Sequence, residues 1–233
     1  MLTTVLLDLD NTLLNIDMSR FMPRFFDALR SHGGDALVDA LMAGTRAALT
    51  NDHPNETNQA VIERVVAEQT GSAGVNRLDQ FYRTVFPTLN NITTPAPDAS
   101  RAVALCQSLG LQTVIATHPL YPHAGIIERM RWAGVAAFDY ALITSSDNTH
   151  ATKPSLKFYR DILVKVGANG AETVMVGDDW QKDIEPAAAL GMKTFWIPTA
   201  KRPNAPAPTL PDGCGSLSDF CEWLTLQVYV EGL

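Results

Sequence analysis

Five short apolar runs recur along the chain, and each contains β-branched residues. They are residues 4–9, 112–117, 140–145, 173–178 and 193–198. Runs of this length and composition are typical of strands that are buried on both faces. Between the later runs, residues 102–109 and 158–166 repeat apolar side chains at helical spacing, and each segment is followed by a glycine that favours a helix end. Strands that alternate with helices predict an α/β fold, with a parallel, Rossmann-like sheet covered on both faces.

One long stretch after the first apolar run has a purely helical pattern. Apolar side chains recur three and four residues apart over residues 18–29 and again over residues 78–86, with no strand pattern between them. The stretch ends in residues 90–100, where two prolines indicate a linker. We therefore predict two parts: a helical cap, residues 17–90, inserted into an α/β core, residues 1–16 and 91–233.

Composition supports a folded chain and argues against some partners. Hydrophobic residues make up 46% of the chain and charged residues 18%, which is typical of a globular protein with a substantial core. The formal net charge is −7 and no basic run offsets it, so nucleic acid is not an expected partner. Residues 198–213 carry five prolines and are expected to form an irregular surface loop. The oligomeric state stays open.

Several features favour a cytoplasmic location. The N-terminal apolar stretch has no basic region before it and is interrupted by two aspartates, so it does not resemble a signal peptide. No apolar run approaches the roughly 18 residues that suggest a membrane span, so no membrane partner is expected. The three cysteines have no metal-binding spacing, and such a sparse, odd set indicates free thiols in a reducing compartment.

Two acidic groups occur where predicted strands end. Asp8 and Asp10 are two residues apart, so on a strand they point to the same face. Asp178 and Asp179 end a later strand, and Asp183 follows them. Because the carboxyl ends of parallel strands share one crevice, these five carboxylates are expected to lie close together. Their mutual repulsion requires a positive partner, and a hard divalent cation with oxygen ligands, Mg²⁺ above all, fits that need.

Two simpler explanations exist for these carboxylates. A calcium loop of the EF-hand type that began at Asp8 would need glycine at its sixth position and glutamate at its twelfth, where the chain has Leu13 and Ser19. That explanation fails. Asp183 is equally well explained as an acidic residue that favours a helix N-terminus.

Two further residues are candidates for the same crevice. Lys153 lies between a predicted strand and a helix, followed by Pro154 at the helix entry. A lysine there can neutralise a carboxylate and bind a phosphoryl oxygen. Thr117 ends another predicted strand and can donate a hydroxyl hydrogen bond to the same group.

At these residues the sequence resembles the haloacid dehalogenase-like superfamily of aspartate-nucleophile phosphohydrolases. The stretch "DLDNTLL" matches its first motif, DxDxT, and "GDDWQKD" matches its acidic fourth motif. Thr117 matches the second motif and Lys153 the third, although "THP" and "KPSL" depart from the usual continuations of those motifs. The order and spacing hold from residue 4 to about 197, and the helical stretch lies where this superfamily commonly inserts a cap.

The resemblance implies a Mg²⁺-dependent phosphatase that acts on a small phosphorylated metabolite. It implies that Asp8 is the nucleophile that forms an aspartyl-phosphate, and that Asp10 protonates the leaving oxygen and then deprotonates water. Lys153 and Thr117 would bind the phosphoryl group.

The resemblance also implies how the cation is held. Its ligands would be the carboxylates of Asp8 and Asp178 and the backbone carbonyl of Asp10. Asp179 and Asp183 would bind it through water or orient Lys153.

Alternatives on the same scaffold stay open at this point. They are a sugar-phosphate mutase, a 2-haloacid dehalogenase and a non-catalytic domain that binds phosphoproteins. The acidic cluster and Asp10 argue against the dehalogenase, which needs neither a cation nor that acid. His118 and His123 lack ligand partners at suitable spacing, so they are interpreted as loop residues. Arg20 and Arg24 on the first cap helix either reach the far end of a substrate or form a solvated face.

Overall fold

A parallel sheet forms the centre of the structure, a computed structural model that describes residues 1–51, 53, 55–199 and 210–230. Within these residues its strand order is β5–β4–β1–β6–β7–β8, and every neighbouring pair is parallel. The strands are β1 (Thr4–Leu7), β4 (Gln112–Ile115), β5 (Leu142–Ile143), β6 (Thr173–Gly177), β7 (Lys193–Trp196) and β8 (Gly213–Cys214). The predicted fold class is confirmed, and each of the five predicted apolar runs contains one strand of this sheet. The predicted loop of residues 198–213 lies in part, at residues 200–209, outside the described residues.

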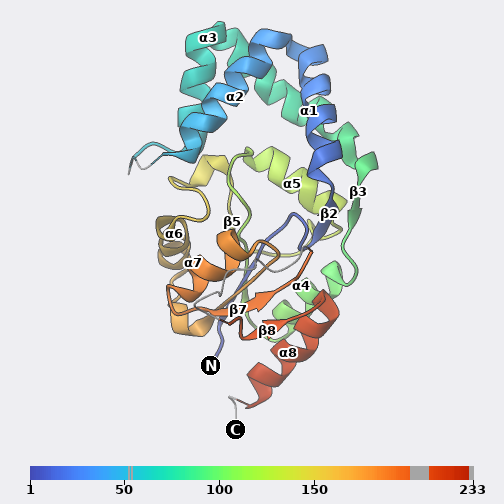
Figure 1. Ribbon diagram of the computed structural model, residues 1–233, viewed down its shortest axis with the longest axis vertical. Helices are drawn as coiled ribbons and strands as arrows, with labels where there is room; N and C mark the ends of the chain where they lie inside the picture. Colours follow the sequence, from blue (N-terminus) through green and yellow to red (C-terminus); the bar gives the residue numbers. More distant parts are fainter. Residues whose placement is uncertain (52, 54, 200–209, 231–233) are drawn as a thin grey trace.

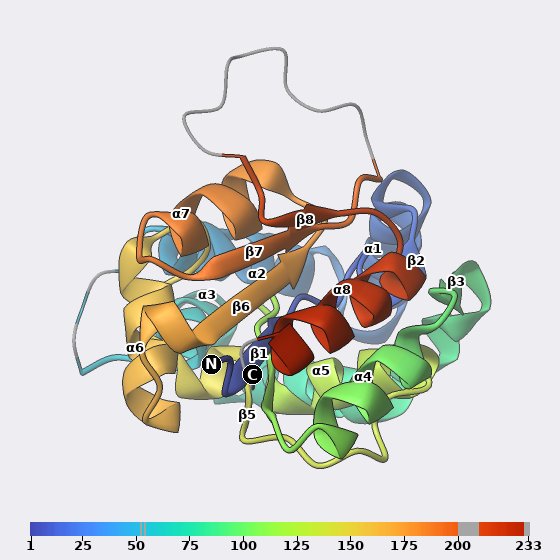
Figure 2. The same ribbon diagram turned by 90° about the horizontal axis from the view of Figure 1, so that it is seen from below.

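Helices cover both faces of the sheet (Figure 2). One face packs against α6 (Leu156–Val166) and α7 (Glu185–Ala188), and the other against α4 (Ala99–Ser108), α5 (His123–Trp132) and α8 (Leu217–Val230). The alternation of side chains along β1 explains this arrangement, because successive residues of a strand point to opposite faces. Leu6 joins the core under α6, whereas Val5 and Leu7 join the core under α4 and α8. Both faces of β1 are therefore apolar, as its continuous apolar sequence predicts.

A group of helices stands apart from the sheet, at the top of Figure 1. It consists of α1 (Met18–Gly33), α2 (Asp35–Leu49) and α3 (Asn58–Gln80), followed by the short helices η1 (Phe81–Val85) and η2 (Phe86–Ile92). Phe21 and Phe25 of α1 and Phe86 of η2 are buried in its core. Phe86 also stacks on Trp132 of α5, with 5.0 Å between ring centroids, so the helical group rests on the α/β part through aromatic contacts.

The chain passes between the two parts twice, at neighbouring positions. β2 (Leu14–Ile16) leads out of the α/β part and β3 (Thr93–Pro95) returns, and the two strands pair as an antiparallel ribbon. The predicted linker therefore contains a strand, which pairs with the segment that directly follows "DLDNT". This pairing places the start of α1 next to the carboxyl edge of β1. Across the described residues, no helix combines the length and the apolar character needed to cross a bilayer.

Three further short helices complete the described elements. They are η3 (Ser146–Asn148), η4 (Gly170–Glu172) and η5 (Trp180–Ile184). Of these, η5 follows β6 and carries part of the acidic fourth motif.

Candidate active site

The loop after β1 is shaped by the polar residues of "DLDNT". Asp8 lies just beyond β1, where its backbone N–H donates to the carbonyl of Val176 at 2.9 Å, so the residue is still held by β6. Asn11 has a φ of 58°, a left-handed conformation that asparagine tolerates better than most residues. Its side-chain oxygen accepts from the Ile16 N–H at 3.2 Å, which fixes the turn into β2. Thr12 donates its hydroxyl to Asp8 Oδ2 at 3.3 Å and so orients that carboxylate.

The edge of β6 supplies a second pair of carboxylates. Asp178 follows β6 directly, and its Oδ2 accepts from the Thr199 hydroxyl at 2.9 Å. Asp183 lies one turn later in η5 and is almost completely buried. Gly177 makes room for it, because a Cβ at that position would lie 2.2 Å from Asp183 Oδ2. The glycine of "VGDD" is therefore required by a close approach of side chain to backbone.

Lys153 connects the carboxylates that follow β1 with those that follow β6. Its Nζ donates to Asp8 Oδ1 at 2.7 Å and to Asp183 Oδ1 at 2.6 Å, and the lysine is only 3% exposed. Burial opposes the charged form of the lysine, but the carboxylates of Asp183 and Asp8 outweigh this and raise its pKa. Burial also opposes the charged form of Asp183 and so raises its pKa, and the Lys153 ammonium counteracts that rise. The ammonium and the two carboxylates therefore hold one another in place in a region of low polarity.

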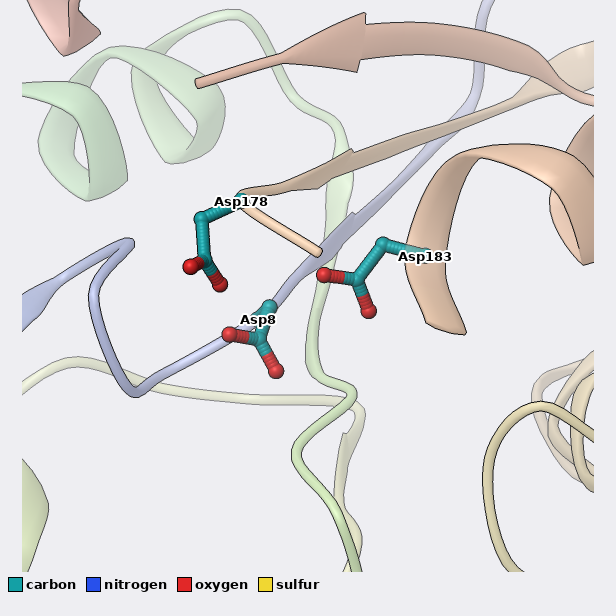
Figure 3. Close-up of side chains that lie close together, drawn as sticks. All are labelled: Asp8, Asp178 and Asp183. Carbon is teal, nitrogen blue, oxygen red and sulfur yellow. The ribbon is translucent and has the colours of Figure 1, made fainter. Parts of the chain in front are cut away.

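Three carboxylates come close enough to bind one cation. One oxygen each from Asp8, Asp178 and Asp183 lie within 4.8 Å of one another, and the three side chains converge in Figure 3. Burial, followed by the charge of Asp8, raises the pKa of Asp178 to about 6. Three carboxylates beside one lysine leave an excess of negative charge when all are ionised. This donor set fits a hard divalent cation, which binds carboxylate oxygens.

Asp179 points elsewhere, although it is adjacent to Asp178. Its Oδ1 accepts from the backbone N–H groups of Gln181 at 3.1 Å and Lys182 at 3.0 Å, so it caps the start of η5. Its Oδ2 accepts from Lys182 Nζ at 2.7 Å. The backbone N–H of Asp179 donates to Asp183 Oδ2 at 3.1 Å and thereby helps to position Asp183. Whether Asp179 also reaches the cation through water stays a prediction.

Asp10 forms an ion pair with an arginine that the sequence analysis missed. Arg129 of α5 is 1% exposed and contacts the Asp10 carboxylate with Nη2. Its guanidinium lies over the ring of Tyr121, 4.6 Å from the centroid. Burial lowers the pKa of Arg129 to about 10, against the opposing charge of Asp8. A signal was present, because Arg129 shares the buried face of its helix with Ile126 and Met130, where a charge requires a partner.

Thr117 and His118 line the same cavity. Thr117 lies beyond the end of β4 with 1% exposure, and its carbonyl accepts from the Thr144 hydroxyl at 2.9 Å. Burial and the charge of Lys153 lower the pKa of His118 to about 4, so its ring is neutral near pH 7. The three remaining candidates, His123, Arg20 and Arg24, are not part of the lining.

The structure brings the seven residues predicted for catalysis or cation binding to one cavity of about 240 Å³ at the carboxyl edge of the sheet. Its lining includes Asp8, Asp10, Thr117, Lys153, Asp178, Asp179 and Asp183, together with Arg129 and His118. Oδ1 of Asp10 and Nδ1 of His118 are buried there without a hydrogen-bond partner among the described residues. Buried polar atoms of this kind indicate a place for water or a ligand.

A crevice at the strand ends that holds a lysine among carboxylates is typical of an α/β enzyme site, and its three converging carboxylates could bind a cation. The comparison with known families agrees. The haloacid dehalogenase-like hydrolase model matches residues 2–191, and the chain belongs to this family of hydrolases. The predicted family and the prediction of an enzyme are both confirmed.

Individual relatives are more distant. The chain is 25% identical over 213 residues to a glyceraldehyde 3-phosphate phosphatase of Methanocaldococcus jannaschii, covering 84% of this chain and 85% of the relative. It is 30% identical over 143 residues to a phosphoglycolate phosphatase of Neisseria gonorrhoeae, covering 61% of this chain and 54% of the relative. These relatives support a phosphoric monoester hydrolase. Among solved structures, a 2-haloacid dehalogenase of Pseudomonas syringae has a TM-score of 0.69 at 20% identity, covers 97% of this chain and 100% of its own, and shows the shared fold.

Proposed function

We propose that this protein is a Mg²⁺-dependent phosphatase that hydrolyses a small phosphorylated metabolite through an aspartyl-phosphate on Asp8. The observation that carries the proposal is the placement of Lys153 between Asp8 and Asp183, beside a cluster of three carboxylates. Phosphoryl transfer depends mainly on positioning and on positive charge around the transferred group. A fixed ammonium and a set of cation ligands next to a carboxylate nucleophile provide both.

Each predicted catalytic residue has a task that its surroundings support. Asp8 attacks phosphorus with a carboxylate oxygen, and the bond from phosphorus to the leaving oxygen breaks. Asp10 in its protonated form gives a proton to the leaving oxygen, and the carboxylate that results takes one from the water that hydrolyses the aspartyl-phosphate. Its Oδ1 is available for this exchange, since it has no hydrogen-bond partner among the described residues. Lys153 and Thr117 bind the phosphoryl oxygens.

The cation and Arg129 would assist these residues. The carboxylates of Asp8 and Asp178 and the backbone carbonyl of Asp10 would hold the cation, and Asp183 is close enough to reach it directly or through water. When bound, the cation would supply positive charge opposite the transferred phosphoryl group. Arg129 holds the Asp10 carboxylate at the cavity wall and is a positioning residue for the acid and base.

The helical group would act as the cap of this enzyme. We assign residues 17–90 to the cap and residues 1–16 and 91–233 to the catalytic core, with the ribbon of β2 and β3 as the connection. Because α1 begins next to the cavity, movement about this ribbon would change access to Asp8 and exclude water from the reaction.

The proposal is tested by phosphate release from p-nitrophenyl phosphate and a panel of phosphorylated metabolites. We expect turnover with Mg²⁺, its loss on addition of EDTA, and its recovery when excess Mg²⁺ is restored. Equal turnover in EDTA would contradict the role of the cation. Three other outcomes would identify the alternatives. Chloride release from 2-chloropropionate would indicate a dehalogenase, and a requirement for a bisphosphate activator would indicate a mutase. Tight binding of phosphate esters without turnover would indicate a binding domain.

The binding of Mg²⁺ should depend on pH through Asp178. Its pKa of about 6 in the folded, metal-free protein is higher than the ~3.9 of an unfolded aspartate. Its protonation therefore stabilises the metal-free fold below the unfolded value, and that contribution is lost as the pH rises through about 6. A cation relieves the resulting repulsion, so Mg²⁺ should raise the midpoint of thermal unfolding more at about pH 7.5 than at about pH 5.

Two variants control this measurement. Asp178→Asn should reduce the difference between the two pH values, whereas Asp39→Asn, an exposed position on α2, should preserve it. Equal stabilisation by Mg²⁺ at both pH values in the wild type would count against Asp178 as a ligand.

A further inference from the structure

A second cavity, of about 330 Å³, lies beside the catalytic cavity, between the cap helices and the loop after β4. Eight of its ten lining side chains are apolar or aromatic, so it favours an apolar occupant. The lining comprises Met22, Phe25 and Phe26 of α1, Leu41, Met42, Thr45 and Arg46 of α2, Tyr82 of η1, and Leu120 and Tyr121.

The two cavities share part of their lining. Leu120 and Tyr121 line both of them. Along α1, Met18 lines the catalytic cavity and Met22 lines the second cavity, and residues four apart lie on the same face of a helix. Apolar and aromatic side chains therefore form the wall that runs from the catalytic cavity into the cap. Met18 and Met42 are 38% and 39% exposed, which leaves these flexible apolar side chains open to a ligand.

From this continuity we propose that the substrate is a phosphate monoester whose leaving group carries an apolar chain or ring, and that the second cavity binds that group. The inference rests on the proposed function and adds the substrate class. The space is sufficient, since a closed apolar cavity of ~150 Å³ already holds benzene. Thr45 and Arg46 are the two polar side chains of the lining, and they could accommodate a polar group on the chain.

The inference is tested with a series of alkyl phosphates from ethyl to hexyl phosphate, assayed with Mg²⁺. Burial of each methylene should raise kcat/KM about three- to fourfold, and therefore roughly 80- to 250-fold over the four methylenes between ethyl and hexyl phosphate. Thr45→Trp places a bulky ring in the cavity and should flatten this dependence. Ala36→Trp, at an exposed position of the same helix, should preserve it. Thermal unfolding of both variants verifies that they are folded.

A binding measurement separates this inference from the proposed function. Alkylphosphonates of the same lengths are not hydrolysed, and their affinity, measured by calorimetry with Mg²⁺, should rise with chain length in the wild type and less steeply in Thr45→Trp. Turnover without any dependence on length would overturn the inference and leave the phosphatase intact. Absence of turnover for every ester would overturn the function, and the phosphonates would still decide the role of the cavity. An undiminished dependence in Thr45→Trp would show that the chain binds elsewhere.

Discussion

Replacing Asp8 by asparagine should abolish phosphate release, with a loss of at least about 10⁴-fold in kcat, as is typical when a nucleophile is removed. The amide has nearly the same shape but is neutral, so it attacks phosphorus poorly. The carboxylate accepts a strong, charge-assisted hydrogen bond from Lys153 Nζ at 2.7 Å, and a neutral amide oxygen would accept a weaker one. Single-turnover release of p-nitrophenol from p-nitrophenyl phosphate measures the attack by Asp8 directly, because this leaving group departs in that step.

A matched variant shows whether the effect is specific to the site. Asp39→Asn makes the same chemical change at an exposed position of α2 and should retain wild-type turnover. The Asp8→Asn protein should remain folded, because the amide oxygen can still accept from Lys153 Nζ while the amide nitrogen donates to the Thr12 hydroxyl, which can turn to accept. Turnover comparable to the wild type in folded Asp8→Asn would rule out the assignment of the nucleophile.

The sequence was sufficient for the parts of the fold that are buried on both faces. β1 and β6 are continuous apolar runs because helices cover them on each side, and their carboxyl ends meet wherever such strands are neighbours. β2, β3 and β8 have only two or three residues each, and their pairing depends on segments distant in the chain. Local pattern carries little information about strands of this kind.

At the site, too, local sequence pattern does not specify how some side chains are oriented. Asp178 and Asp179 are adjacent and chemically identical, yet one converges with Asp8 and the other caps η5. Their directions follow from the backbone of a single turn, which residue types alone do not specify. Arg129 becomes a site residue only because α5 packs its buried face towards Asp10. The cytoplasmic location and the absence of nucleic-acid partners stay predictions of the sequence.

Replacing Lys153 by methionine should have a large effect on stability as well as on turnover. The ammonium is the shared partner of two carboxylates, Asp8 and Asp183, that are 7% and 1% exposed. Removal of one partner from a buried ion pair leaves uncompensated charge and costs about 3–5 kcal/mol in the free energy of unfolding. At roughly 2–4 °C per kcal/mol for a chain of this size, the midpoint of thermal unfolding should fall by about 6–20 °C.

Two conditions should reduce this defect, and both follow from its electrostatic cause. Without the ammonium, burial favours the protonated form of Asp183, so the variant should lose less stability relative to the wild type at low pH than at neutral pH. Mg²⁺ supplies replacement charge and should raise the unfolding midpoint of Lys153→Met more than that of the wild type. Lys157→Met breaks a half-exposed ion pair with Asp161 on α6 and should cost no more than about 1 kcal/mol, without either dependence. A Lys153→Met protein that unfolds like the wild type at neutral pH without Mg²⁺ would show that the buried cluster does not depend on this lysine for its charge balance.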